Sequence, residues 1–278
     1  MSLRDRSGAR ITRALEPGLL LLPGLCCLAF AFFLPVGLLL AYSLYEPTPG
    51  GGSALGLGQY ARFFEDAYYL GVMGRTFRLA FLVTLICLLM GFPIAYIMAR
   101  AKPRLAIWLG ILVIMPLMVS VVIRTFGWMV LMGRGGFLST LATSLGLEAR
   151  SFVFMRTETG MVIALAQVLL PFMVLTLYGV VARVEREFEE AARTMGSGFF
   201  GTLWRVTIPL SLPGVISGSL LVFALSISSF ITPSLVGGVR LPVLAGSIYQ
   251  QALVTVDWSF AAAQAVILLI AVLLIIVP

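Results

Sequence analysis

The sequence predicts an all-α membrane protein with six transmembrane helices. Of its 278 residues, 60% are hydrophobic and only 11% are charged, and the mean hydropathy is +1.06. A water-soluble domain of this size cannot bury so much apolar surface, because the buried fraction levels off below what this composition requires. Six apolar stretches approach or exceed the ~20 residues that a spanning helix needs: 19–44, 79–99, 105–123, 161–181, 214–231 and 260–278.

The charged residues favour a membrane topology signal over nucleic-acid binding. The net charge is +7, but the basic residues are scattered and lie mostly at the ends of apolar stretches. Cys26, Cys27 and Cys87 fall inside apolar stretches, so we expect packing roles and no disulfide. The chain has no histidine, which removes the commonest general base and metal ligand. A membrane enzyme is therefore not expected.

The distribution of Lys and Arg predicts that the N-terminus is cytoplasmic. With residues 1–18 inside, the cytoplasmic segments hold four basic residues before the first span, three in 100–104 and four in 182–213. The opposite side holds seven, so the excess lies inside. The first stretch is too long for a cleaved signal, and we expect residues 19–278 to form one transmembrane domain with both termini cytoplasmic. The last stretch lacks a basic flank, so we expect that a C-terminal anchor is missing from this sequence.

Each span has its own irregularity. Prolines interrupt several stretches, which predicts kinked helices whose freed carbonyls are satisfied by neighbours. After the third stretch, residues 124–132 are aromatic-rich and too short to span, which favours an interfacial or re-entrant piece; a longer, tilted third helix is the alternative. Residues 239–256 are too mixed to cross, and we expect them at the outer surface.

Between the fourth and fifth stretches, residues 182–213 form a polar loop with helical spacing. Apolar residues recur every three or four positions over 184–199, which predicts a helix with one apolar stripe. Its polar face contains Glu189 and Arg193 at a spacing that allows an ion pair. Gly196 is expected to end this helix in a left-handed conformation and Ser197 to cap the next one. Phe199, Phe200, Leu203 and Trp204 supply the second helix's apolar face, which Pro209 and Pro213 end.

This loop resembles the cytoplasmic EAA coupling loop of ABC importer permeases. The residues that carry the resemblance are Glu190, Ala191, Ala192, Gly196, Val206, Ile208 and Pro209. The resemblance implies a type I importer permease bundle in which these residues couple the helices to a cytoplasmic ABC ATPase dimer. Residues 91–96, GFPIAY, are similar to a second motif of binding-protein-dependent permeases.

Residues 124–136 and 241–262 narrow the resemblance to the spermidine/putrescine permease family. Ser259 and Ala261 replace the Pro and Gly that this family usually has there. The resemblance implies uptake of a polyamine, with an opine or another small organic solute as the alternative. It further implies a second permease subunit, identical or homologous, an extracytoplasmic solute-binding protein and a bacterial inner-membrane location. The chain lacks a P-loop motif and needs no cofactor, so ATP and magnesium belong to the partner ATPase.

The solute path is weakly marked in the sequence. A polyamine favours carboxylates and aromatic faces, and the spans contain no central Asp or Glu. The candidates are Asp257, Trp128, Tyr249 and Trp258. A stand-alone secondary transporter is the third possibility, but the internal repeat or intramembrane charges that usually accompany ion coupling are not found.

Overall fold

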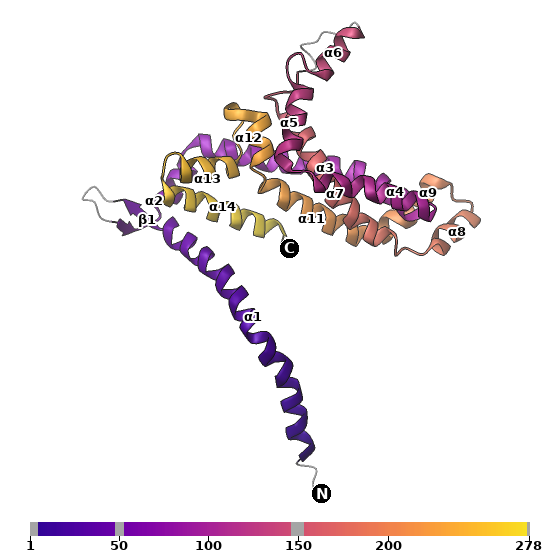
Figure 1. Cartoon of the computed structure of the whole chain (residues 1–278), viewed down its shortest axis with the longest axis horizontal. Helices are drawn as coiled ribbons and strands as arrows, with labels where there is room; N and C mark the ends of the chain where they lie inside the picture. Colours follow the sequence, from indigo (N-terminus) through magenta and orange to yellow (C-terminus); the bar gives the residue numbers. More distant parts are fainter. Residues whose placement is uncertain (1–4, 48–52, 146–152, 277–278) are drawn as a thin grey trace.

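The computed structural model describes residues 5–47, 53–145 and 153–276, which are almost entirely helical (Figure 1). Two short strands, β1 and β2, pair antiparallel after the first helix. The elements are α1 Asp5–Ser43, β1 Tyr45–Pro47, β2 Ser53–Leu55, α2 Gly58–Glu65, α3 Ala67–Arg100, α4 Pro103–Ile114, η1 Met115–Met118, α5 Val121–Met132, α6 Phe137–Ser144, α7 Glu158–Val181, α8 Arg186–Thr194, α9 Phe199–Thr202, η3 Leu203–Thr207, α10 Ile208–Leu210, α11 Leu212–Ile227, α12 Ile231–Gly237, η4 Gly238–Arg240, α13 Leu244–Leu253 and α14 Trp258–Ile276.

The core of the molecule is a bundle of α3, α7 and α11, which run side by side in Figure 1. Helix α7 is the central element, and two thirds of its apolar window is buried. Glycines let the helices approach closely: a Cβ on Gly214 would lie 2.8 Å from the Val180 side chain, and one on Gly218 would lie 3.0 Å from the Met173 sulfur. Small residues have this role at helix contacts in membranes. Pro93 and Pro171 are accommodated inside continuous helices.

Helix α1 leans away from this bundle and contacts mainly α14 (Figure 1). No residue from Leu22 to Tyr42 is buried within the chain, and burial begins at Ser43. Large side chains such as Phe30, Phe32 and Phe33 are exposed along it. This helix therefore offers its length to lipid or to another subunit.

Five described helical stretches are long and apolar enough to cross a membrane, and two bent helix pairs raise the possible number to seven. The prediction of one continuous span over 105–123 is wrong. The backbone turns extended at Val119 and Ser120, between η1 and α5. Pro116 lies in the first turn of η1, and its missing N–H favours the end of α4 just before it. Residues 124–132 lie in a separate helix, α5, which rises from the bundle toward α6 (Figure 1).

The segment after α11 folds back onto the bundle. The helical run Ile231–Arg240, which is α12 with η4, meets α13 at 84°, an angle typical of a broken span or a re-entrant loop. Residues 239–256 therefore include the helix α13. The backbone N–H of Leu244 donates to the buried Thr76 hydroxyl at 2.8 Å, and Arg75 donates to the Pro242 carbonyl at 3.2 Å. These bonds fix α13 against α3.

Candidate functional site: a polar network beneath the coupling loop

The polar loop folds into two helical pieces joined at Gly196. Helix α8 ends at Thr194, and Gly196 has a φ of +84°, as expected. This left-handed residue brings the Ser197 N–H to the Ala192 carbonyl at 3.0 Å, which satisfies an end group of the helix. Ser197 is not the cap of the next helix, contrary to the prediction. Gly198 occupies that position and the cap has no side-chain bond.

The second piece does not end at Pro209. Helix α9 continues through a π-helical turn, η3, into α10, where Pro209 lies in the first turn and needs no hydrogen bond from its nitrogen. The bend comes at Ser211, where α11 starts at 69° to the preceding helix. The Ser211 hydroxyl donates to the Thr207 carbonyl at 2.6 Å and closes this corner.

An apolar surface covers the outside of the loop. It consists of side chains that are all at least half exposed: Phe188, Met195, Phe199, Phe200 and Trp204. We call these five residues the loop apolar face. Such a group of large exposed side chains on polar helices is typical of a protein contact site.

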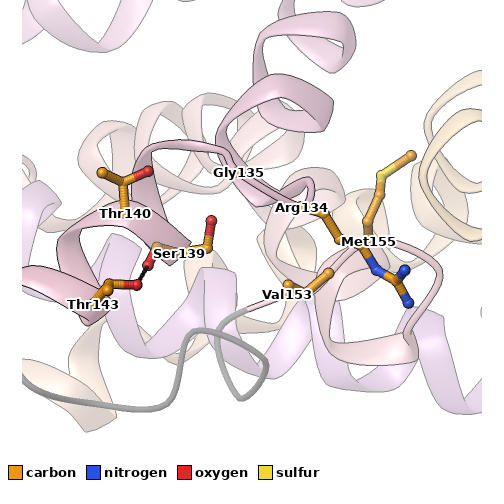
Figure 2. Close-up of a pocket in the computed structure, with 7 residues that line it drawn as sticks. All are labelled: Arg134, Gly135, Ser139, Thr140, Thr143, Val153 and Met155. Atoms are coloured by element: carbon orange, nitrogen blue, oxygen red, sulfur yellow. Dashed lines mark hydrogen bonds between the residues drawn. The ribbon is translucent and has the colours of Figure 1, made fainter.

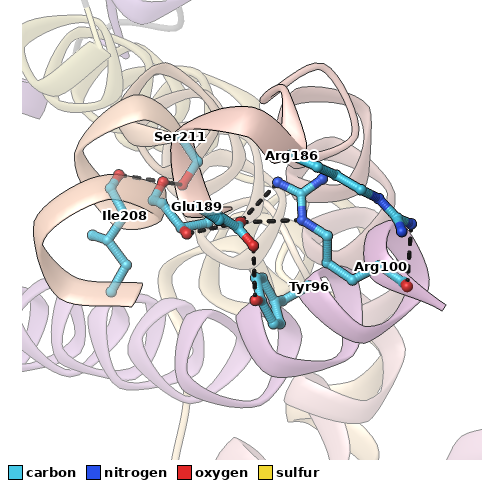
Figure 3. A network of polar contacts seen from close by, with 7 residues as sticks. Tyr96, Arg100, Arg186, Glu189, Ile208 and Ser211 are labelled. Atoms are coloured by element: carbon cyan, nitrogen blue, oxygen red, sulfur yellow. Dashed lines mark hydrogen bonds and ion pairs between the residues drawn. The ribbon is translucent and has the colours of Figure 1, made fainter. Parts of the chain in front are cut away.

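Glu189 of α8 points toward Tyr96 and Arg100 and is only 4% exposed (Figure 3). Its carboxylate accepts hydrogen bonds from Arg100 Nη2 at 2.8 Å, Arg100 Nε at 3.1 Å, Thr207 Oγ1 at 3.0 Å and Tyr96 Oη at 3.2 Å. Tyr96 and Arg100 end α3, and Thr207 ends η3. One side chain therefore connects the coupling loop to the core helix α3 and to the corner that leads into α11. We call these four residues the Glu189 network.

The network is electrostatically balanced. Burial raises the pKa of Glu189, but the bonds from Arg100, Thr207 and Tyr96 outweigh it and hold the pKa below its usual value. Arg100 is 14% exposed, so both charges are largely removed from water. Arg186, at the start of α8, also donates to the Arg100 carbonyl at 3.2 Å, which adds a second link between α8 and α3 (Figure 3).

The coupling residues predicted from sequence surround this network without forming it. Glu190, Ala191, Gly196 and Pro209 are exposed, whereas Ala192, Val206 and Ile208 are half-buried. The predicted pair of Glu189 with Arg193 is wrong, because Glu189 pairs with Arg100. Sequence reasoning missed the roles of Arg100, Tyr96 and Thr207 in this network. Arg100 stands at the end of an apolar stretch, which also fits a topology anchor, and Tyr96 closes the GFPIAY motif.

The predicted solute-path residues have different surroundings. Trp128 donates to the Gln167 side chain at 3.2 Å, between α5 and α7. Tyr249 stacks on Phe230 at 4.4 Å between ring centroids and lines a cavity of about 390 Å³ with Ser234 and Gln250. Trp258 is exposed at the start of α14.

Asp257 has structural partners. Its carboxylate forms an ion pair with Arg62 at 2.9 Å and accepts the Phe260 N–H at 3.1 Å, so it caps the start of α14. Arg62 in turn lies 4.0 Å from the centre of the Phe260 ring. The acid joins α2 to α14.

A separate cavity of about 850 Å³ lies where α5 turns into α6 (Figure 2). Arg134, Ser139, Thr140 and Thr143 contribute polar groups to its lining. The Ser139, Thr140 and Thr143 hydroxyls bond to carbonyls of their own segment. None of the predicted path residues lines it.

Comparison with known proteins gives a consistent result. Residues 91–278 match the family described as "Binding-protein-dependent transport system inner membrane component". The chain is 31% identical over 207 residues to the spermidine/putrescine transport system permease protein PotB of Haemophilus influenzae, covering 74% of this chain and 72% of that protein. It is 32% identical to PotB of Escherichia coli K12, covering 77% of this chain and 78% of that protein. The molybdenum transport system permease ModB of Mycobacterium tuberculosis is 35% identical, covering 53% of this chain and 54% of that protein.

The fold is also found in solved structures. A chain of a bacterial ABC transporter involved in alginate import superposes with a TM-score of 0.80 at 15% identity, covering 98% of this chain and 96% of that one. A chain of a second alginate transporter structure, in complex with a periplasmic protein, superposes with a TM-score of 0.80 at 16% identity. The match covers 97% of this chain and 94% of that one. The expected importer permease fold is confirmed.

Proposed function

The chain belongs to the family of binding-protein-dependent transport system inner membrane components, and on this premise we propose that it is the permease subunit of an ATP-driven polyamine importer. The observation that carries the coupling role is the Glu189 network, which ties the loop to α3 and to the corner before α11. A force applied to α8 would reach two core helices through one buried carboxylate.

We propose that a cytoplasmic ABC ATPase dimer docks on the loop apolar face and that this partner binds ATP and magnesium. The exposed Phe188, Phe199 and Trp204 supply apolar contact area, and Glu190 adds a charge beside them. Closure of the ATPase dimer would move α8, and the Glu189 network would pass the movement to the bundle. The alternate opening of the bundle to either side would then carry the solute.

A second permease subunit and an extracytoplasmic solute-binding protein complete the proposed assembly. The exposed length of α1 supports a permease partner, because this helix leaves its own bundle. The family description supports the binding protein. Co-purification with the ATPase separates this proposal from a stand-alone transporter: a complex that imports solute without any ATPase overturns it.

The solute assignment comes from the relatives named for spermidine and putrescine. It is tested by reconstituting the full complex and measuring import of radiolabelled spermidine and putrescine against a complex with an inactive ATPase. We expect ATP-dependent uptake of at least one. Molybdenum uptake in the same vesicles is the second candidate, since a shorter match is to a molybdenum permease. Uptake of molybdenum with no polyamine import would overturn the polyamine assignment and leave the importer assignment intact.

A further inference from the structure

Arg124 carries an unpaired charge within a span-length apolar stretch. It lies in α5, and its Nε and Nη1 atoms are buried without a hydrogen-bond partner in the described residues. Other arginines of the helical bundle have carboxylate partners: Arg75 and Arg78 bind Glu158, and Arg100 binds Glu189. Charged side chains at such positions are expensive to bury and usually mark a functional site.

Arg124 lines a cavity of about 420 Å³ at the break between η1 and α5. Ser120 and Val121, at the start of α5, line it on one side, and Val168 and Phe172 of α7 line it on another. The first intrahelical bond of α5 runs from the Arg124 N–H to the Ser120 carbonyl, so the preceding N–H groups of this turn are free of helical partners. Among the described residues of the lining, Arg124 is the only charged one, so it gives the cavity a positive charge.

The described helices around the cavity supply no free counter-charge. The acid of α7 is Glu158, which lies ten residues before Val168, roughly 15 Å along the helix, and already binds Arg75 and Arg78. The helix that carries Arg124 is also held in place. Thr125 bonds to Thr232 of α12 at 3.1 Å, and Trp128 bonds to Gln167 of α7, so α5 cannot rotate freely.

We propose that this cavity binds an oxyanion, a carboxylate or a phosphate, that the Arg124 guanidinium neutralises. The exposed Met118 and Val119 make it reachable from outside the chain. The anion would come from a phospholipid headgroup or from a free phosphate or carboxylate, since the proposed polyamine solutes are cations. The inference goes beyond the proposed function and does not depend on which solute is carried.

Trp128 provides a local reporter, because it lies one helical turn after Arg124. The assembled complex in neutral detergent is titrated with dioctanoylphosphatidylglycerol, inorganic phosphate or acetate, and the signal is the emission that Trp128→Phe removes. We expect a saturable change with at least one probe. Arg124→Gln should weaken the apparent affinity at least tenfold, and Arg124→Lys at least threefold, because lysine lacks the planar guanidinium.

Arg134→Gln is the matched control, since it removes the same charge from an exposed position between α5 and α6. It should bind like the wild type. A response to the lipid alone assigns a headgroup site, and a response to phosphate or acetate assigns a site for a free anion. Absence of a saturable response in the wild type, or unchanged affinity in Arg124→Gln, overturns the proposal. If that variant fails to assemble, unchanged affinity in Arg124→Lys overturns it.

Discussion

Arg100, the last residue of α3, donates two hydrogen bonds to the buried carboxylate of Glu189 in α8, across a separation of 89 residues in the chain. The pair joins the end of a core helix to a surface loop. Because both groups are largely shielded from water, each depends on the other for its charge to be tolerated.

Glu189→Ala should destabilise the protein strongly. The change leaves the Arg100 guanidinium without its carboxylate, and loss of one partner of a buried pair costs about 3–5 kcal/mol. We expect a lower melting temperature of the purified complex and loss of ATPase stimulation by loaded binding protein. Glu190→Ala is the control. Glu190 is the next residue and is exposed, so its replacement should change the free energy of unfolding by no more than ~0.5 kcal/mol. Equal melting temperatures of the two variants would contradict the stabilising role of the Glu189 network.

The contribution of Glu189 should depend on pH in one direction. Its pKa is lowered from 4.5 in the folded protein, so the unfolded chain binds the proton more tightly. The stabilisation is present above 4.5 and is lost as the pH falls through the lower folded value. The difference in melting temperature between wild type and Glu189→Gln should therefore be constant from neutral pH to about 5 and shrink below 4.5. A difference that grows on acidification would refute the assigned charge state.

Gly196→Val should uncouple the loop while leaving the protein inserted. A φ of +84° costs a β-branched residue about 1–2 kcal/mol, so the turn between α8 and α9 should reorganise. The readout is stimulation of the partner ATPase, which we expect to disappear. Gly198→Val is the control, because Gly198 is extended and a Cβ there meets nothing within 4 Å. Normal stimulation in Gly196→Val would mean that the loop only connects two spans.

The predicted topology places Ser144 outside and Ser197 inside. Single cysteines at these positions, in a background without Cys26, Cys27 and Cys87, distinguish the two sides. An impermeant thiol reagent added to intact cells should label the cysteine at 144 and spare the one at 197. Labelling in the opposite pattern reverses the orientation and removes the loop from reach of a cytoplasmic ATPase.

Asp257→Asn tests whether Asp257 only caps α14 or also contacts the solute. Asn is a good N-cap, so α14 should keep its start, and loss of the half-exposed pair with Arg62 should cost no more than ~1 kcal/mol. Arg62→Gln breaks the same pair and serves as the control. If uptake falls in Asp257→Asn alone, the carboxylate contacts the solute. Equal uptake in both variants assigns Asp257 to structure only.

Hydropathy located most spans because lipid-facing helices must be apolar along their whole length. It failed at residues 119–120, where the composition stays apolar across a backbone break. The left-handed conformation of Gly196 was predicted correctly from the residue type, since it is a local property of the turn.

Glu189 could not be identified in the same way. It stands in a run of acidic residues and has the spacing of a solvent-facing charge. What buries it is Arg100, Tyr96 and Thr207, and the first two lie far away in the sequence. The ion pair of Asp257 was hidden for the same reason, because its partner Arg62 is 195 residues distant. A single sequence reports on such partners only when their spacing is local.

The π-helical turn Leu203–Thr207 makes the length of the loop as important as its composition. A π turn holds more residues than an α turn and commonly arises from one inserted residue. Deleting one residue there would restore a regular helix and rotate every later side chain by about 100°. Thr207 would then turn away from Glu189, and Pro209 of α10 would face another direction at the corner before α11. The number of residues between Gly196 and Pro209 should therefore be fixed, and a one-residue deletion there should break the Glu189 network even when Phe199, Trp204 and Thr207 are all retained.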